Sequence, residues 1–306
     1  MSHLNDINMP AITVGVITLD RRKQAFVKLL EYLDPALSAY KGQLELLICN
    51  NGEASTEPQI ENTLAKHLPT FNGTARVINS PENNIAIGRN VVLDNAAFDL
   101  VAFLDDDEYP SANWLNEMVN VLTECSSVVV AGPVLPVFEQ DCPAWVKTTD
   151  LHNVRNRRNK GPIRMSGTGN VLIDTRPIKE LRFNRTFGQT GGSDTEFFLR
   201  LYDAGHAMHW ASDALVYEDI PANRAQTAYM LKRFKIQGNN YRRIMQERGA
   251  IKNTPLFLAR AVFMCVASLP IAGILWILKK PSAGDWLKRS FSNYGKLFKP
   301  PEQLYD

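Results

Sequence analysis

Four consecutive acidic residues follow directly on an apolar run at residues 101–104; they are Asp105, Asp106, Asp107 and Glu108. A strand of a parallel sheet is covered on both faces and shows such a continuous apolar run, so the acids are expected at its carboxyl end. That edge of an open α/β sheet is where ligands bind. Because side chains alternate along a strand, we expect Asp105 and Asp107 to project the same way, roughly 7 Å apart, and Asp106 the opposite way.

A positive charge between Asp105 and Asp107 would be favourable, because the predicted spacing brings two carboxylates close together. Two carboxylates at that separation repel each other by roughly 2–3 kcal/mol at an effective dielectric constant of about 20. A divalent cation would remove this repulsion, and carboxylate oxygens are the ligands that Mg²⁺ and Mn²⁺ prefer. The alternative is a solvated acidic turn, with Glu108 in it, ahead of a helix that begins near Ser111, which is its predicted N-cap.

A second group of reactive residue types is the sequence Gly-Gly-Ser-Asp-Thr-Glu at residues 191–196. The two glycines let the backbone approach a ligand closely, and Asp194 stands at the start of a predicted helix. A carboxylate at a helix N-terminus is held ionised, which suits a general base. An ordinary helix cap made by Ser193 or Asp194 explains the same residues, so both interpretations stay open here.

The elements that position these residues alternate between strand and helix patterns. Strands are predicted at residues 12–19, 44–50, 75–79, 100–105, 128–137 and 165–174, and helices at 26–33, 87–98, 111–124 and 197–204. This alternation favours a doubly wound, mostly parallel sheet flanked by helices. The first two strands end at Thr18 and at Asn50 and Asn51, so these side chains should share the sheet edge with Asp105. No P-loop motif occurs, which disfavours phosphoryl transfer.

The polar segment at residues 141–162, rich in Asn, Arg and Lys, is predicted to be a mobile loop, and a solvated basic surface explains it equally well. The four cysteines lack Cys-x-x-Cys spacing and are read as reduced core thiols. Residues 1–10 lack the basic and apolar regions of a signal peptide, so the catalytic part is expected in the cytosol.

The C-terminal part of the chain is basic and partly apolar. Residues 232–299 hold 14 Lys and Arg against Glu247 and Asp285, which favours an anionic partner, and residues 261–278 contain no charge. About 20 apolar residues are needed to span a bilayer, so a spanning helix, a membrane-embedded or interfacial helix pair and a soluble apolar helix all stay open. Because the charges surround an apolar stretch, a membrane surface is preferred over nucleic acid.

Together these motifs resemble the family 2 glycosyltransferases with the GT-A, Rossmann-like fold. The resemblance rests on Thr18, on Asn50 and Asn51, and on residues 85–90, 103–108 and 191–198, and it covers roughly residues 10–245. Residues 141–145, 221–224 and 234–239 are similar to bacterial exopolysaccharide glucosyltransferases of the succinoglycan type. The resemblance implies two domains, a nucleotide-sugar glycosyltransferase domain at 1–221 and a helical membrane-associating region at 222–306.

The resemblance also implies roles for particular residues. The residues that would bind the nucleotide sugar are Thr18, Arg21, Asn50, Asn51, Arg89, Asp105 and Asp106. Asp107 would bind Mn²⁺ or Mg²⁺ at the sugar diphosphate, and Asp194 would be the catalytic base of a single inverting displacement. Glu218 or His209 could complete the metal shell, although His206 and His209 are read mainly as ordinary core or surface residues.

Three features of this chain qualify the resemblance. The family usually has Asp at one or both positions held here by Asn50 and Asn51, which weakens the choice of uracil as the base. It commonly has Glu where Ser193 stands. Gln226 near Arg224 does not form the Gln-x-x-Arg-Trp motif of processive synthases, so a single-sugar transferase is preferred.

The function predicted from the sequence is a metal-dependent inverting hexosyltransferase. It would move a hexose from a UDP-sugar to a lipid-linked saccharide at the cytoplasmic face of the cell membrane, in exopolysaccharide biosynthesis, without binding nucleic acid. The alternatives are an inactive sugar-nucleotide-binding scaffold, against which the intact Asp105, Asp107 and Asp194 argue, and a sugar nucleotidyltransferase. The latter lacks its Gly-rich, Lys- or Arg-bearing signature after the first strand.

Overall fold

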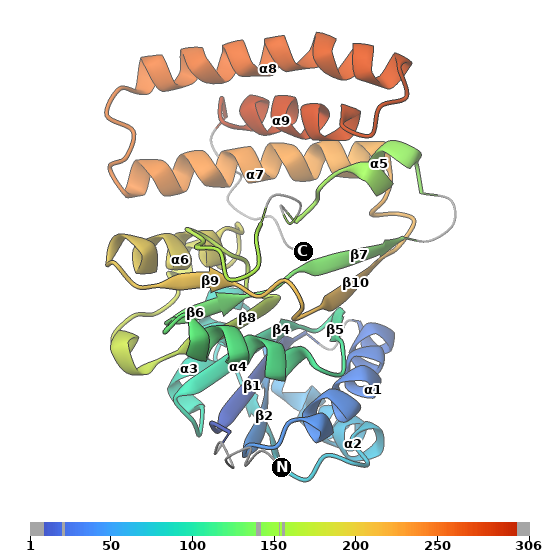
Figure 1. Ribbon diagram of the computed structural model, residues 1–306, viewed down its shortest axis with the longest axis vertical. Helices are drawn as coiled ribbons and strands as arrows, with labels where there is room; N and C mark the ends of the chain where they lie inside the picture. The colour runs from blue at the N-terminus through green and yellow to red at the C-terminus, as the bar shows by residue number, and fades with distance from the viewer. Residues whose placement is uncertain (1–8, 20–21, 139–141, 153, 155–156, 299–306) are drawn as a thin grey trace, which may run out of the picture. The chain divides into compact units, whose positions relative to one another are not determined.

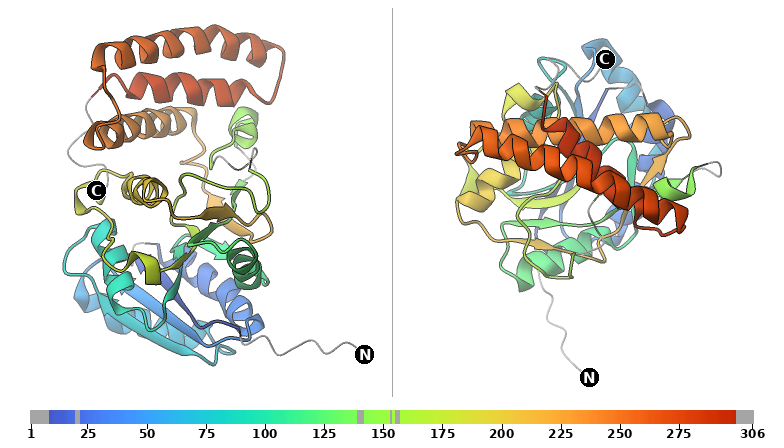
Figure 2. Two further views of the ribbon diagram at one scale, coloured as in Figure 1. Left: turned by 60° about the vertical axis from the view of Figure 1, so that its left-hand side comes forward. Right: turned by 90° about the horizontal axis from the view of Figure 1, so that it is seen from above.

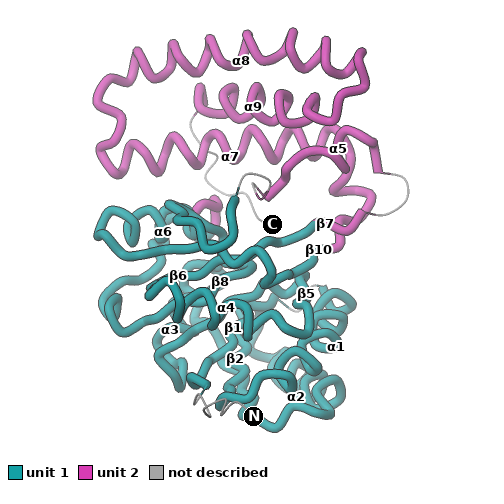
Figure 3. The backbone as a smooth tube through the Cα atoms, in the orientation of Figure 1, with its two compact units in different colours: residues 1–135, 156–188, 193–218 teal, residues 136–155, 189–192, 219–306 magenta. Residues whose placement is uncertain are grey.

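The computed structural model describes residues 9–19, 22–138, 142–152, 154 and 157–298. The chain divides into two compact units, which are coloured separately in Figure 3. Unit 1 comprises residues 1–135, 156–188 and 193–218, and unit 2 comprises residues 136–155, 189–192 and 219–306.

In the described part of the chain, unit 1 is built around a seven-stranded sheet (Figure 1). In spatial order its strands are β3 (Thr74–Asn79), β2 (Leu44–Asn50), β1 (Ile12–Thr18), β4 (Leu100–Asp105), β8 (Asn170–Asp174), β6 (Val129–Ala131) and β9 (Met208–Trp210). The first four are parallel, β6 is parallel to β9, and β8 is antiparallel to β4 and β6. The expected mostly parallel sheet is confirmed, with one reversed strand inside it.

Two strands are shorter than the sequence pattern predicts. The apolar run at 128–137 is divided into β6 and β7 (Val134–Phe138) at Gly132 and Pro133. Asn170 is responsible for the division, because its side-chain amide donates to the carbonyl of Pro133 at 2.8 Å and its carbonyl accepts from Gly132 N at 3.0 Å. The strand predicted at 165–174 forms only from Asn170 onward, as β8.

Helices cover both faces of the sheet in unit 1. One face packs against α1 (Lys23–Ala39), α2 (Glu57–His67) and α4 (Trp114–Glu124), which contribute Leu30, Ile60 and Trp114 to a single apolar core. The other face packs against α3 (Ile85–Asn95) and α6 (Ser193–Asp203). There the ring of Phe183 stacks on Phe197 with centroids 4.0 Å apart. Short 3₁₀ turns occur at Ala54–Thr56, Arg176–Ile178 and Arg185–Phe187.

Two helices begin at residues other than those predicted. Helix α3 begins two residues early, because the Asn84 side chain caps it by accepting the N–H of Ala86 at 3.1 Å. Helix α4 begins at Trp114, so the prediction of Ser111 as its cap is wrong. The Ser111 N–H instead donates to the carbonyl of Leu215 at 2.8 Å, which holds residue 111 outside the helix.

A second, three-stranded sheet has the order β5-β10-β7, with β5 at Glu108–Pro110 and β10 at Val216–Ile220. Strands β5 and β10 are antiparallel, and their register places Glu218 opposite Glu108. Strand β5 follows β4 after only two residues, so the acidic tract connects the two sheets.

Unit 2 is helical and contains α5 (Ala144–Thr148), α7 (Thr227–Glu247), α8 (Thr254–Ile277) and α9 (Ala283–Gly295). Helix α9 lies between α7 and α8, as Figure 1 and the left view of Figure 2 show. Helix α5 was not predicted, because residues 141–162 were expected to form a loop. Its Trp145 and Val146 are buried in an apolar cluster with Phe234 of α7.

Helix α8 is the helix in the described residues that is long and apolar enough to cross a membrane. The small residues Ala261, Ser268 and Ala272 are buried, whereas large apolar side chains on α8 are exposed, with Phe263 67% and Ile277 79% accessible. Only 17% of its most apolar stretch is buried. An apolar surface of this extent on one helix is typical of contact with a partner or a membrane.

Candidate active site at the carboxyl ends of β1 and β4

The direction of the strand order reverses between β1 and β4. From β1 the chain continues to β2 and β3 on one side, then returns to form β4 on the other side of β1. In register, Ile17 of β1 lies opposite Asp105 of β4, and Thr18 lies opposite Asn50 of β2. At such a switch point the two loops diverge and leave a place for a ligand. The structure therefore brings Thr18, Asn50 and Asp105 to one edge.

The acidic tract is a strand end, a turn and a new strand. β4 ends at Asp105, Asp106 and Asp107 form a turn, and β5 begins at Glu108. The Thr18 hydroxyl donates to Asp106 Oδ2 at 2.9 Å. The Arg22 guanidinium lies 3.3 Å from Asp106 Oδ1 and is ion-paired with Asp107. The prediction that Asp106 and Asp107 point to opposite sides is wrong, because alternation applies only inside a continuous strand.

The carboxylates of the tract influence one another electrostatically. Burial raises the pKa of Asp105 to about 7; the Arg89 charge opposes the rise, and the charges of Asp107, Asp106 and Asp194 add to it. The Asp105 side chain is nevertheless 42% accessible to solvent. A carboxylate that is crowded by protein atoms and still reachable from solvent is well placed to contact a ligand.

Glu108 and Glu218 form a buried pair of acids that the sequence pattern did not identify as a pair. They lie opposite each other in β5 and β10 and are 5% and 7% exposed. Burial, then the charges of Asp105 and Glu218, raise the pKa of Glu108 well above its ordinary value. Glu218 therefore lies with the acidic tract, whereas His209 pairs with the Ser127 hydroxyl at 2.7 Å. The sequence contains only a weak signal for this pairing, because 109 residues lie between Glu108 and Glu218.

Arg89 links the acidic tract to the second group of residues. It is 7% exposed; one terminal nitrogen donates to Ser193 Oγ at 2.8 Å, and the other lies 3.9 Å from Asp105 Oδ1. Its Nε is buried and has no hydrogen-bond partner in the described residues. Ser193, where the resembling family commonly has Glu, thus holds the guanidinium beside Asp105.

Asp194 lies in the first turn of α6, as the sequence predicts. Its Oδ1 accepts the N–H of Thr195 at 2.7 Å, and its Oδ2 lies 3.5 Å from the position a Cβ would take on Gly167. Gly167 therefore leaves space beside the carboxylate. Because the charge of Asp194 contributes to the raised pKa of Asp105, the two predicted site residues lie within electrostatic reach of each other.

The two predicted asparagines hold loops together at this edge. The Asn50 amide donates to Glu53 O at 2.9 Å and to Asn79 Oδ1 at 2.8 Å, and it accepts the N–H of Gly52 at 3.1 Å. Asn51 Oδ1 accepts the N–H of Asn84 at 3.2 Å. Arg21 lies outside the described residues.

No group of three or more His, Cys, Asp or Glu among the described residues is arranged to hold a metal ion. Mg²⁺, however, is usually bound by one or two carboxylates together with substrate phosphates. The donors at this edge fit such a cation: Asp107 and Asp105 supply hard oxygen atoms, and their mutual repulsion favours a positive charge between them. Among the described residues, the Arg22 guanidinium is one cation that already lies there.

The arrangement is that of a glycosyltransferase with the GT-A fold. The mannosyltransferase PcManGT from Pyrobaculum calidifontis, in complex with GDP-Man and Mn²⁺, matches with a TM-score of 0.63 and 17% identity, covering 95% of this chain and 86% of that chain. S. aureus TarS 1-349, in complex with UDP-GlcNAc, matches with a TM-score of 0.52 and 16% identity. That match covers 75% of this chain and 65% of TarS 1-349, so the chain spans slightly less than two thirds of it.

The chain belongs to glycosyl transferase family 2, whose model matches residues 14–182. It is 30% identical over 239 residues to the succinoglycan biosynthesis protein ExoM of Rhizobium meliloti, covering 78% of this chain and 76% of that protein. The family and fold expected from the sequence are therefore confirmed.

Proposed function

We propose that this protein is a metal-dependent inverting hexosyltransferase that uses a UDP-sugar and extends a lipid-linked saccharide. The observation that carries the proposal is the link made by Arg89. This buried guanidinium joins Asp105, at the switch point of the sheet, to Ser193, the neighbour of Asp194. A donor-binding carboxylate and a general base are thereby held in one site, as transfer requires.

The donor is proposed to bind at the ends of β1, β2 and β4. The carboxylate of Asp105 would accept hydrogen bonds from the ribose, while Thr18 and Asp106, already bonded to each other, would form the floor beneath the nucleotide. Arg21 is assigned to the base, Asn50 and Asn51 to holding the loops around it, and Arg89 to the base or diphosphate. A nucleotide donor is supported by the complexes of PcManGT with GDP-Man and of TarS with UDP-GlcNAc.

The transfer step is assigned to Asp194. Its carboxylate accepts the proton of the acceptor hydroxyl while the hydroxyl oxygen attacks the anomeric carbon of the donor sugar. The bond from that carbon to the diphosphate oxygen breaks, and UDP leaves with its electron pair. A single displacement inverts the anomeric carbon, so an α-linked donor gives a β-glycoside.

A Mn²⁺ or Mg²⁺ ion bound by Asp107 would neutralise charge on the leaving diphosphate. Asp107 is 15% exposed and already attracts one positive group, Arg22. Asp105 and Asp107 supply the oxygen atoms that fit the cation. Arg22 would have to release Asp107 when the cation binds.

The acceptor is proposed to be lipid-linked and the protein to act at the cytoplasmic face of the cell membrane. The exposed apolar surface of α8 and the relation to a succinoglycan biosynthesis protein support this assignment. Accordingly, residues 1–221 are proposed as the transferase domain and residues 222–306 as the membrane-associating region. A role in exopolysaccharide biosynthesis follows from the same relation.

A panel of nucleotide sugars tests the proposal. Purified protein is incubated with each donor and with Mn²⁺, Mg²⁺ or a chelator, and nucleotide release is measured. We expect release from one UDP-hexose, loss with the chelator, and a β-linked product by NMR when an acceptor is added. Nucleotide binding without turnover on any acceptor, or pyrophosphate release from a sugar phosphate and a nucleoside triphosphate, would contradict the proposal.

A further inference from the structure

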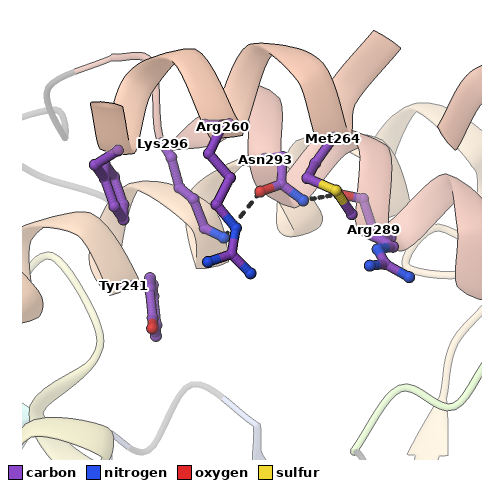
Figure 4. Close-up of a pocket in the computed structure, with 8 residues that line it drawn as sticks. Tyr241, Arg260, Met264, Arg289, Asn293 and Lys296 are labelled. Atoms are coloured by element: carbon purple, nitrogen blue, oxygen red, sulfur yellow. Dashed lines mark hydrogen bonds between the residues drawn. The ribbon is translucent and has the colours of Figure 1, made fainter. Parts of the chain in front are cut away.

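Unit 2 contains a cavity of about 280 Å³ whose lining residues come from α7, α8, α9 and the residue that follows α9 (Figure 4). Its lining includes Tyr241, Arg260, Met264, Arg289, Asn293 and Lys296. We call it the cationic cavity. Binding pockets for small molecules measure roughly 300–1,000 Å³, so this cavity is of a size for a head group rather than a whole lipid.

The cationic cavity gathers three positive side chains and has no carboxylate in its lining. Within the described residues, Arg260, Arg289 and Lys296 form no ion pair. Lys296 donates to Asn293 Oδ1 at 3.0 Å, and its ammonium lies 4.9 Å from the Tyr241 ring centroid. Burial lowers the pKa of Lys296, and the charges of Arg260 and Arg289 lower it further. The three cations therefore repel one another, and an anion among them would relieve that repulsion.

The surroundings of the cavity indicate what kind of anion it takes. Arg260 and Met264 belong to α8, the helix whose other side chains, such as Phe263 and Val266, are 67% and 62% exposed. A free anion would satisfy the cations and leave this apolar surface in water. A molecule with an anionic head and an apolar tail satisfies both features, and arginine is suited to recognising phosphate oxygens.

We infer that the cationic cavity binds the phosphate-bearing head group of a membrane lipid through Arg260, Arg289 and Lys296. Two lipids carry this chemistry, an anionic phospholipid and a lipid-linked saccharide joined through phosphate. The inference deepens the proposed function and rests on its membrane location, because it assigns residues to the lipid phosphate.

The test compares two double variants of the full-length protein. Arg260→Gln/Lys296→Gln removes two charges from the cavity. The control, Lys279→Gln/Lys280→Gln, removes two exposed charges just beyond the end of α8, outside the cavity. Binding is measured by flotation with phosphatidylcholine vesicles that contain or lack phosphatidylglycerol, and by calorimetry with inorganic pyrophosphate.

We expect the cavity variant to lose at least tenfold in affinity for phosphatidylglycerol vesicles and to lose pyrophosphate binding. The control is expected to keep pyrophosphate binding and to lose less vesicle affinity, because it removes only general attraction. Equal losses in both variants, or wild-type binding by the cavity variant, would overturn the inference. Arg260→Lys, which keeps the charge, is expected to bind vesicles as the wild type does, and a circular dichroism spectrum of the cavity variant shows whether its loss is a folding defect.

Two further readouts separate this inference from the proposed function. Hydrolysis of the UDP-sugar without acceptor depends on the site in unit 1, so the cavity variant is expected to hydrolyse it as the wild type does. Absence of hydrolysis in the wild type itself would count against the transferase and not against the cavity. A cavity variant that has lost vesicle binding and also loses transfer to a lipid-linked acceptor supplied in detergent identifies the acceptor as a bound lipid; a cavity variant that has lost vesicle binding but keeps this transfer identifies a phospholipid.

Discussion

The contact between α7 and α9 gives the sharpest prediction for stability. A Cβ on Gly238 of α7 would collide with the backbone carbonyl of Ser292, and the Gly295 backbone lies 3.1 Å from the same position. Gly238→Ala therefore forces two helix backbones apart. Because backbone cannot rotate away, the cost falls in the upper part of the range for overpacking, about 2–3 kcal/mol.

Part of that cost is offset by the better helix propensity of alanine, about 1 kcal/mol. The net expectation for Gly238→Ala is a loss of about 1–2 kcal/mol, or a fall in Tm of about 2–3 °C for a chain of this size. Gly273 of α8 is the matched control, since a Cβ there would meet no atom within 4 Å. Gly273→Ala should stabilise by about 0.5–1 kcal/mol and raise Tm by about 1 °C.

Thermal unfolding followed by circular dichroism, with all three proteins in the same detergent, measures both effects. The expected order of Tm is Gly273→Ala, wild type, Gly238→Ala. Because α9 carries Asn293 of the cationic cavity, Gly238→Ala should also weaken pyrophosphate binding. A Gly238→Ala protein as stable as Gly273→Ala would refute the close packing of α7 on α9.

Two further predictions concern the acidic tract. Arg22→Gln removes one cation from Asp107; a partly exposed ion pair contributes about 1 kcal/mol, so Mn²⁺ binding to the nucleotide-free protein should tighten about fivefold. Calorimetry would show this, and Arg185→Gln, which breaks an exposed pair with Glu82, should change nothing. Because burial raises the pKa of Asp105 to about 7, affinity for Mn²⁺ and UDP should rise about tenfold from about pH 6 to about pH 8. The stability of the ligand-free protein has the opposite pH dependence. Protonation of Asp105 contributes fully to the free energy of unfolding below the ordinary carboxyl pKa, and this contribution is lost as the pH rises through about 7. A weaker affinity for Mn²⁺ in Arg22→Gln, or a pH-independent affinity, would contradict these predictions.

The parallel part of the sheet could be predicted from the sequence because it depends on local pattern. The bounds of β2 and β4 agree with the predicted 44–50 and 100–105, since both are mostly apolar runs that end in a polar residue, although β2 contains Glu45. The order of these strands also predicts that Thr18 lies close to the acidic tract, because the carboxyl ends of parallel strands lie at the same edge of a sheet.

What the sequence did not reveal depends on contacts between distant residues. The pairing of Glu108 with Glu218 requires β10 to lie beside β5, and neither short strand has a pattern that selects its partner. The Arg22 contact with Asp107 requires the chain to turn after Asp105. Helix α2 was missed because its mostly polar surface weakens the apolar periodicity, and only Ile60 and Leu64 are buried.

The central claim, that Asp194 is the base of a metal-dependent transfer, is tested most directly by Asp194→Asn. The amide keeps the shape of the carboxylate but cannot accept the proton of the acceptor hydroxyl. We predict that this variant binds UDP with Mn²⁺ as the wild type does and loses transfer, measured by UDP release with acceptor, by about 10²- to 10⁴-fold. Transfer at the wild-type rate by Asp194→Asn would contradict the account.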